Sequence, residues 1–411
     1  MKQPRDLVLT GVTVIDGTGG PPLDGAAIRV SDGRIAGVGA ADGVLADAHR
    51  DGVDEVIELA GAFVTPGLIN THTHLSLGLP GALGAALDRM TAHELVLYMA
   101  DGARRTPEAG VTTVRCVAER DGADFALRRA IEAGQAIGPR IFTAGRALVC
   151  TGGHGHGHGD TRECDGPAEF RKGARREISL GADLIKVMIS GGIAGEHEGM
   201  DTPQLQPDEL EAVITTAHDW GRKVTAHAGP AGIIDKAVRL GLDCVEHGYH
   251  LTGDVARLMA ERGVTLVPTL VVTRCGEFFD QLDVPCWMQQ RSLAAGRRHL
   301  ESYQMALEAG VEVMLGSDMP PFWEFEGTTA TVRELEWMIE GGLAPAAALQ
   351  AATIVPARWL GADADLGTLE VGKRADLVAL AADPLADPKA WRTIGLVMKA
   401  GEVVRNDGWP R

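Results

Sequence analysis

Short apolar segments alternate with longer segments of helical pattern along most of the chain, and this alternation constrains the fold more than any other feature. Eight segments have the pattern of strands: FVTPGLINT, VTTVRCV, RIFTAGRAL, ADLIKVM, KVTAHA, LDCVEHG, VTLVPTL and VEVMLGSD. Helical stretches such as ADFALRRAIEAG and PDELEAVITTAHDWG fill most of the gaps. Strands that alternate with helices form parallel βαβ units, and eight such units predict an α/β protein with a (β/α)8 TIM-like barrel.

The two ends of the chain have a different pattern. Short β-branched runs separated by Gly and Asp turns occur near the start, as in DLVLTGVTVID and AAIRVSDGRIAGVG, and again near the end, as in ADLVALAAD and TIGLVMKAG. We therefore expect one small β domain built from both termini, residues 1–62 and 361–411, beside a barrel of residues 63–360. A chain of 411 residues is long enough for both.

The charge balance argues against two classes of partner. Lys plus Arg is 39 and Asp plus Glu is 56, so the formal net charge of −17 disfavours nucleic acid and anionic membrane surfaces. No apolar run approaches the length of a membrane span, and the segment MKQPRDLVLTGVTVIDG has no apolar signal-peptide core. The six cysteines lie far apart without a CxxC pair. We expect a cytoplasmic homo-oligomer that acts on a small molecule.

Metal-binding side chains recur where the predicted strands end, which is where barrel active sites lie. The first strand ends in His72 and His74, whose spacing places both imidazoles on one face. The fifth, sixth and eighth strands end in His227, His247 and Asp318. A lone histidine on a strand is more often a hydrogen-bonded core residue, and Asp318 alone is equally explained as a helix N-cap. The coincidence over several strands predicts a metal site.

Lys186 lies inside the apolar fourth strand, in LIKVMISGG. Burial disfavours an ammonium ion, so the amine is expected to be neutral and nucleophilic. A neutral amine can capture CO2 as a carbamate, which supplies an anionic oxygen ligand able to bridge two cations. The alternative is a lysine that snorkels to the rim of the barrel.

The ordered series HTH, Lys, His, His and Asp at the ends of strands one, four, five, six and eight resembles that of binuclear members of the amidohydrolase superfamily. The segments VTPGLINTHTHL and LGTLEVGKRADLVAL are also similar to that superfamily, so the resemblance covers nearly the whole chain. The segments TGGHGH and EHGYH are most similar to those of imidazolonepropionase-like dipeptidases, which cleave Xaa-Pro and related amides.

The resemblance implies a site with two divalent metal ions, and imidazole and carboxylate ligands suit zinc. The implied ligands are His72, His74 and Asp318 for one ion and His227 and His247 for the other, with carbamylated Lys186 and a hydroxide as bridges. The implied reaction is hydrolysis of an amide by that hydroxide, with Asp318 as the proton shuttle to the leaving nitrogen.

Loops after the strands carry candidates for substrate binding. His154, in GHGHGHG, sits at the position that matches the family and is a candidate hydrogen-bond donor to the substrate carbonyl. His156 is a second candidate in the same loop, whereas His158 is expected to face water. Tyr249 either polarises the carbonyl or packs in the interior.

Aromatic residues are 4% of the chain, yet several gather after the seventh and eighth predicted strands: Phe278, Phe279, Trp287, Phe322, Trp323 and Phe325. An apolar pocket wall, to which Trp323 would belong, explains this cluster as well as a subunit interface does. Arg274, in the same region, is a candidate for bidentate binding of a substrate carboxylate, although an ordinary surface arginine is the more common case.

The combined expectation is a binuclear metal-dependent amidohydrolase of dipeptides (Xaa-Pro or Xaa-hydrophobic) or of N-acyl amino acids. Two alternatives remain within enzymes, a cyclic-amide hydrolase and a deaminase of the same superfamily. Mononuclear deaminases usually lack the lysine of strand four, so Lys186 counts against the second. A non-catalytic scaffold on the same barrel is a further alternative, but relatives of that kind lose ligands that this chain retains.

Overall fold

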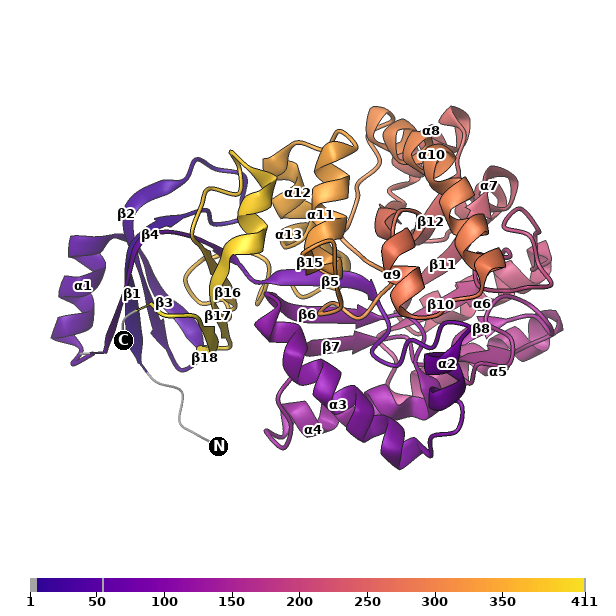
Figure 1. Ribbon diagram of the computed structural model, residues 1–411, viewed down its shortest axis with the longest axis horizontal. Coiled ribbons are helices and arrows are strands. Elements are labelled where there is room, and N and C mark those ends of the chain that lie inside the picture. Colours follow the sequence, from indigo (N-terminus) through magenta and orange to yellow (C-terminus); the bar gives the residue numbers. More distant parts are fainter. Residues whose placement is uncertain (1–5, 54, 410–411) are drawn as a thin grey trace.

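Both ends of the chain contribute to one seven-stranded sheet, on the left in Figure 1. The computed structural model describes residues 6–53 and 55–409. The strand order across this sheet is β18 (Glu402–Asn406), β17 (Ile394–Lys399), β16 (Leu377–Leu380), β4 (Val56–Pro66), β1 (Leu7–Val14), β2 (Leu23–Ser31) and β3 (Arg34–Ala40). Strand β16 pairs antiparallel with β4, with Leu377 opposite Pro66. The prediction that the two ends of the chain pair with each other is therefore confirmed.

The period-two pattern of the strands gives this sheet two apolar faces. In β1, Leu7 and Leu9 belong to a core cluster on one face, while Val8 packs on the other face against Val44 and Ala48. Val44 and Ala48 lie on α1 (Ala41–Arg50), which covers that second face. A strand that is buried on both sides tolerates the continuous apolar sequence seen here.

Most of the remaining strands are parallel and lie in two sheets. One sheet contains β5 (Leu68–Thr73), β6 (Val111–Cys116) and β7 (Arg140–Thr143). The other runs in the order β13 (Thr265–Val267), β12 (Cys244–His250), β11 (Lys223–Pro230), β10 (Leu184–Met188), β8 (Ala147–Val149) and β9 (Thr161–Glu163). Strands β5, β6, β10 and β12 are buried along their whole length. Any polar side chain on them must therefore find partners in the interior.

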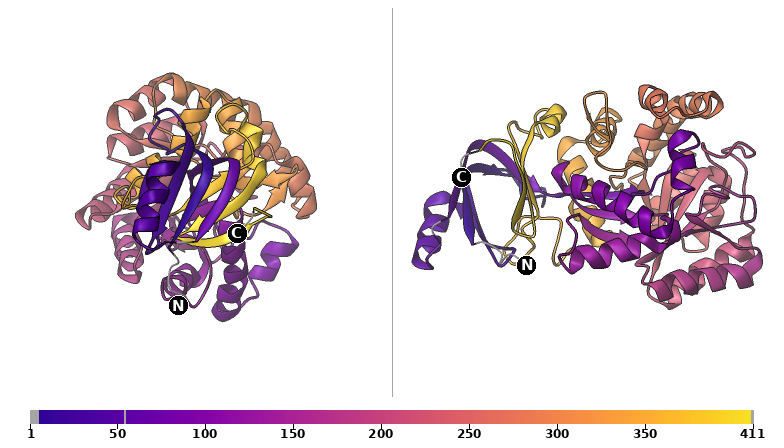
Figure 2. Two further views of the ribbon diagram at one scale, coloured as in Figure 1. Left: turned by 90° about the vertical axis from the view of Figure 1, so that its left-hand side faces the viewer. Right: turned by 60° about the horizontal axis from the view of Figure 1, so that its bottom comes forward.

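Helices lie outside these strands, as both views of Figure 2 show. They are α2 (Ala82–Leu87), α3 (Ala92–Glu108), α4 (Ala123–Glu132), α5 (Gly166–Leu180), α6 (Pro207–Asp219), α7 (Ala231–Arg239), α8 (Gly253–Arg262), α9 (Gly276–Gln281), α10 (Cys286–Glu308), α11 (Ala330–Glu340), α12 (Pro345–Ala351) and α13 (Ile354–Trp359). Several begin at sequence signals: Thr91 and Glu94 form a capping box at α3, and Pro207 occupies the first turn of α6. No helix among the described residues is long and apolar enough to cross a membrane.

The eighth predicted strand, residues 311–318, is not a regular strand, and that detail of the prediction was wrong. Only an isolated bridge joins Val313 to Leu266 of β13. The Met314 N–H donates to the Leu266 carbonyl at 2.9 Å, and on the other side the Thr71 N–H of β5 donates to the Leu315 carbonyl at 2.8 Å. The segment thus connects the two parallel sheets. At the end of the segment, Asp318 has a positive φ of 57°, and its N–H donates to the His72 carbonyl at 2.7 Å.

Candidate active site

A pocket of about 350 Å3 lies among the loops that follow the parallel strands. Its wall includes every metal ligand expected from the sequence: His72, His74, Lys186, His227, His247 and Asp318. The strand register explains part of this convergence, because Lys186 and Met188 lie on one face of β10 and Met188 pairs with His227 of the adjacent β11. The structure brings these side chains together, and their role as ligands remains a prediction.

His72 and His74 present the same ring nitrogen to Asp318. Asp318 Oδ1 lies 3.1 Å from His72 Nε2 and 3.0 Å from His74 Nε2. The other ring nitrogen, Nδ1, lies 2.7 Å from Glu246 Oε2 in His72 and 2.8 Å from the Ala118 carbonyl oxygen in His74. Carbonyl and ionised carboxylate oxygens only accept, so each Nδ1 donates. Nε2 of each ring is therefore the nitrogen that faces Asp318, and although burial would lower it, the hydrogen bond to Asp318 raises the pKa of His74.

Two imidazole nitrogens thus lie within hydrogen-bond distance of the same carboxylate oxygen, and since each Nδ1 already donates, this arrangement needs an added proton or a cation beside that oxygen. Ligand atoms of His72, His247 and Asp318 all lie within 4.8 Å of one another. Although burial alone would raise the pKa of Asp318, the surrounding histidines, His72 first among them, hold it well below its usual range. An ionised carboxylate beside imidazole nitrogens is a donor set that fits a divalent metal ion.

His227 and His247 are the other two histidines expected to bind metal. Burial lowers the pKa of both well below the usual value, so both rings are neutral, as metal binding requires. His227 Nε2 donates to the Gly191 carbonyl at 3.2 Å, and His247 Nδ1 lies 2.7 Å from Thr269 Oγ1. One nitrogen of each ring is thus in contact with a protein oxygen, and His247 Nδ1 also lies 3.9 Å from Asp318 Oδ2.

Lys186 reaches the same pocket from the middle of β10. It is 1% exposed, which argues against a snorkelling lysine, because such a side chain keeps its ammonium group in water. Burial lowers the pKa of Lys186 to about 8, against the opposing effect of the Glu246 and Asp318 carboxylates. A buried amine among histidines and carboxylates therefore has an increased neutral fraction.

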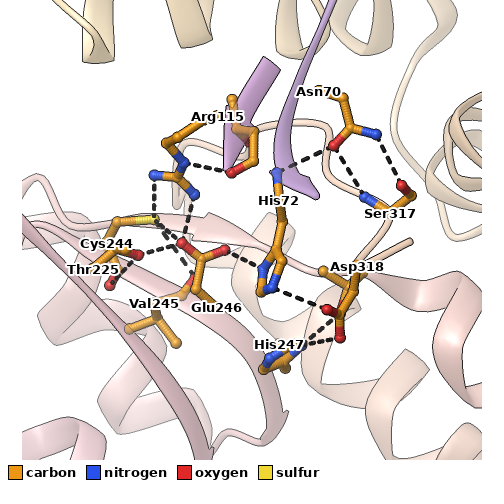
Figure 3. A network of polar contacts seen from close by, with 12 residues as sticks. Asn70, His72, Arg115, Thr225, Cys244, Val245, Glu246, His247, Ser317 and Asp318 are labelled. Atoms are coloured by element: carbon orange, nitrogen blue, oxygen red, sulfur yellow. Dashed lines mark hydrogen bonds and ion pairs between the residues drawn. The ribbon is translucent and has the colours of Figure 1, made fainter. Parts of the chain in front are cut away.

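Glu246 is the centre of a buried polar network that orients His72 (Figure 3). Its Oε1 accepts from Arg115 Nη2 at 2.5 Å and from the Thr225 hydroxyl. Arg115 also donates through Nε to the Thr71 carbonyl. Although burial raises the pKa of Glu246, Arg115 and His72 together hold it well below its usual range. A carboxylate that accepts from a ligand histidine fixes its tautomer and ring orientation.

The sequence analysis missed both Glu246 and Arg115. Each is a charged residue inside an apolar strand that is covered on both faces, and each has 0% exposure. Buried charges of this kind occur in pairs. The sequence did contain a signal for this pair, because Arg115 in RCV and Glu246 in VEHG are oppositely charged residues within two apolar strands.

Three residues at this rim have a backbone conformation that non-glycine residues rarely adopt. The φ angles of His247, Thr269 and Asp318 are 67°, 51° and 57°. Such residues cluster at functional sites, where the surrounding structure holds them in place. Two of the three are expected ligands and the third contacts one of them, which supports a functional role for this end of the strands.

His154 and Tyr249 both line the pocket beside the expected ligands. The His154 ring stacks on the His227 ring with centroids 4.2 Å apart. Tyr249 stacks on His247 at 5.0 Å with an angle of 3° between the rings. Tyr249 is 1% exposed. Both side chains are therefore held against the expected ligand histidines.

The other two histidines of the GHGHGHG loop lie further out. His156 lines the pocket, but its side chain is 54% exposed and pairs with Glu163. His158 was expected to face water, and that expectation was wrong, because it is only partly exposed and lines the pocket. Its Nδ1 is buried, and among the described residues it has no hydrogen-bond partner.

Two substrate-binding candidates, Arg274 and Trp323, do not reach the pocket wall. Arg274 donates from Nη1 to the Leu270 carbonyl at 3.1 Å and from Nη2 to the Gly296 carbonyl at 2.7 Å. Trp323 packs on Phe278 with ring centroids 5.2 Å apart. Neither side chain lines the pocket, and the polar and apolar contacts of both are made within the protein.

Part of the aromatic cluster does form a pocket wall. The apolar side chains that line the pocket on this side include Leu79, Ile193, Val272, Phe279, Trp287 and Met288. Phe278, Trp323 and Phe325 form a cluster with Phe279 behind that wall. Phe322 lies elsewhere, under the Arg105 guanidinium at 4.3 Å.

Comparisons with known proteins agree with this geometry. The profile of the amidohydrolase family matches residues 63–404. Ochratoxinase from Aspergillus niger is 30% identical over 443 residues, which cover 95% of this chain and 85% of that protein. A prolidase complexed with N-methylphosphonate-L-proline superposes with a TM-score of 0.86 at 29% identity, covering 98% of this chain and 100% of the other. A Xaa-Pro dipeptidase with bound methionine in the active site gives 0.85 at 27% identity, with the same coverage. The chain therefore belongs to the amidohydrolase family and is a metal-dependent amidohydrolase.

Proposed function

We propose that this enzyme uses two divalent metal ions to hydrolyse the amide bond of dipeptides or N-acyl amino acids whose leaving residue is proline or hydrophobic. The observation that carries the proposal is the approach of His72 Nε2 and His74 Nε2 to the same Asp318 oxygen, at 3.1 and 3.0 Å, beside a buried lysine and two neutral histidines. The proposed fold is a (β/α)8 barrel of residues 63–360 closed by the segment 311–318, with a β domain of residues 1–62 and 361–411.

The proposed ligands divide between two ions. They are His72, His74 and Asp318 for the first, His227 and His247 for the second, and carbamylated Lys186 as the bridge. The neutral Lys186 amine forms a bond from Nζ to the carbon of CO2 and loses one proton, which leaves an anionic carbamate. The donor set suits zinc. When bound, two such ions supply Lewis acidity, which lowers the pKa of a water molecule and polarises a carbonyl.

Three side chains have proposed roles in the reaction itself. The ionised Asp318 carboxylate accepts the proton of the attacking water and delivers it to the leaving nitrogen. His154 and Tyr249 lie beside His227 and His247, and their proposed role is to contact the substrate carbonyl oxygen. The remaining pocket surface then selects the substrate.

The apolar wall supports a hydrophobic leaving residue. Phe279, Trp287 and Met288 line a pocket of about 350 Å3, which is within the range for small-molecule sites. Burial of a hydrophobic side chain contributes about 1.5–3 kcal/mol. The two solved relatives named as a prolidase and a Xaa-Pro dipeptidase are consistent with such a substrate.

A panel of dipeptides and N-acetyl amino acids tests the substrate class. We expect kcat/KM for leaving residues Pro, Leu, Met or Phe to exceed that for Asp, Glu or Lys by about 10-fold or more, since about 1.4 kcal/mol gives a factor of ten. Release of the leaving amino acid is the readout, and release of ammonia would instead indicate a deaminase.

A matched pair of variants separates the pocket wall from a general effect of losing an aromatic residue. Trp287→Ala is expected to remove most of the hydrophobic preference, because Trp287 lines the pocket. Trp220→Ala is the control, because Trp220 is 55% exposed and lies outside that wall. Equal kcat/KM values across the panel for the unmodified enzyme would contradict the proposed specificity.

A further inference from the structure

We propose that Glu198 is a positioning residue that holds the His154 imidazole in place over His227. The inference rests on the proposed function, because it gives Glu198 a role in the amide hydrolysis in which His154 contacts the substrate. His154 belongs to the Gly-rich loop between β8 and β9, whereas Glu198 belongs to the long loop after β10. The contact joins two residues that are 44 positions apart in the sequence, and it thereby connects two loops of the pocket wall.

The Glu198 carboxylate is fully engaged and well buried. Its side chain is 8% exposed. Oε1 accepts from His154 Nδ1 and from the Gly192 N–H at 3.1 Å, and Oε2 accepts from Gln204 Nε2 at 2.5 Å. Although burial alone would raise the pKa of Glu198, the hydrogen bonds from His154 and Gln204 hold it below its usual range. Ionised Glu198 offers two acceptor oxygens to three donors.

Gln204 completes the arrangement by binding the backbone of the same histidine. Its Oε1 accepts from the His154 N–H at 3.0 Å, while its Nε2 donates to Glu198. Glu198 and Gln204 therefore fix both the ring and the main chain of His154. A side chain that needs only to fill space does not require its backbone and ring to be held by two connected partners.

Gly192 supplies the space that the ring occupies. A Cβ at position 192 would lie 2.7 Å from both Nδ1 and Nε2 of His154, and closer still to Cε1. Only glycine permits this approach of the imidazole to the backbone. On its other side the ring stacks on His227, at an angle of 19°. The imidazole is therefore confined on both faces, and Glu198 determines its rotation.

The hydrogen bond also determines which nitrogen of His154 faces a substrate. A carboxylate can only accept, so Nδ1 carries the hydrogen and donates to Glu198. Nε2 is then the nitrogen left for polar contact with a bound molecule. Groups that orient metal-binding histidines change affinity or activity by about 10–100-fold when they are removed, and we expect an effect of the same size for the carboxylate that orients His154.

A second histidine–glutamate pair of the same loop lacks these buried contacts. His156, two positions further along the loop, contacts Glu163, but the side chains are 54% and 41% exposed. Exposed pairs contribute little. Glu163→Gln is therefore a matched control for Glu198→Gln, with the same chemical change beside a histidine of the same loop.

The test uses the full-length, metal-loaded enzyme with the dipeptide Leu-Pro as the probe. We expect Glu198→Gln to lower kcat by about 10–100-fold with unchanged metal content, and Glu163→Gln to stay within about 2-fold of the unmodified enzyme. Because Glu198 acts through His154, the double variant His154→Ala, Glu198→Gln should be no slower than His154→Ala alone. Histidine 15N NMR should show His154 as the Nδ1–H form in the unmodified enzyme, and a changed Nδ1 signal in Glu198→Gln.

The possible failures are distinguishable. A slow His154→Ala enzyme together with an unaffected Glu198→Gln enzyme would overturn the positioning role and leave the proposed function intact. Additive losses in the double variant would also overturn it, because Glu198 would then act by another route. If no member of the substrate panel is hydrolysed by the unmodified enzyme, the proposed function fails, and the role of Glu198 in it fails too.

Discussion

Lys186→Ala is expected to lose most of the bound metal and to lower kcat/KM by more than about 100-fold, which is the upper end of the effect of residues that only orient metal ligands. The reason is that Lys186 is the one side chain proposed to bind both ions. It is 1% exposed within the same pocket as the five other proposed ligands. Metal content by elemental analysis and kcat/KM on the best dipeptide are the two measurements.

A lysine on the neighbouring strand provides the control for this variant. Lys223 lies at the start of β11 and donates to the Trp359 carbonyl at 2.6 Å, outside the pocket. Lys223→Ala should retain its metal ions and its turnover. Added acetate or propionate should partly restore metal and activity to Lys186→Ala, because a small carboxylate can occupy the place of the carbamate. A Lys186→Ala enzyme with full metal content and full rate would contradict the bridging role.

Asp318→Asn is expected to lower kcat by about 10²–10⁴-fold, the usual contribution of a general acid–base group. Asparagine keeps the shape of the side chain and one oxygen that can bind a metal ion, but it cannot accept and return a proton. Much of the metal should therefore remain bound while turnover is lost. Asp318 also contacts three of the proposed ligand histidines, so metal content must be measured on the same preparation.

Asp201→Asn is the matched control for this substitution. Asp201 contacts His250 in a nearby loop, its side chain is 62% exposed, and it is absent from the pocket wall. The control should turn over within about 2-fold of the unmodified enzyme, because the Asp201 carboxylate is mostly in solvent and lies outside the pocket. Near-normal turnover in Asp318→Asn would place the proton transfer on another residue.

The fold and the expected ligands were accessible from the sequence for a physical reason. Parallel strands covered on both sides are apolar throughout, so a histidine or lysine in such a strand is conspicuous. His227 and His247 stand in the segments VTAHAG and VEHGYH, at the ends of the adjacent strands β11 and β12, and their ring centroids lie 4.6 Å apart. The pairing of the two chain ends was visible because their β patterns are alike.

The remaining features depend on packing between segments that are far apart in sequence. Arg274 follows a predicted strand, as active-site residues of barrels do, but its guanidinium donates hydrogen bonds to backbone carbonyls of the protein itself. The contact of Glu198 with His154 joins two loops whose paths no local pattern determines. The segment ending at Asp318 has a strand-like sequence, but positive φ at its last residue cannot be read from composition.

The measurement that tests the central claim most directly is the activity of the purified enzyme as a function of its metal content. Apo-enzyme prepared with a chelator should be inactive and should regain kcat on titration with zinc in the presence of bicarbonate, which supplies CO2 for Lys186. Activity should reach its maximum at about two equivalents per chain, as a two-metal site requires. Full activity at one equivalent, with no change on adding a second, would contradict the binuclear site.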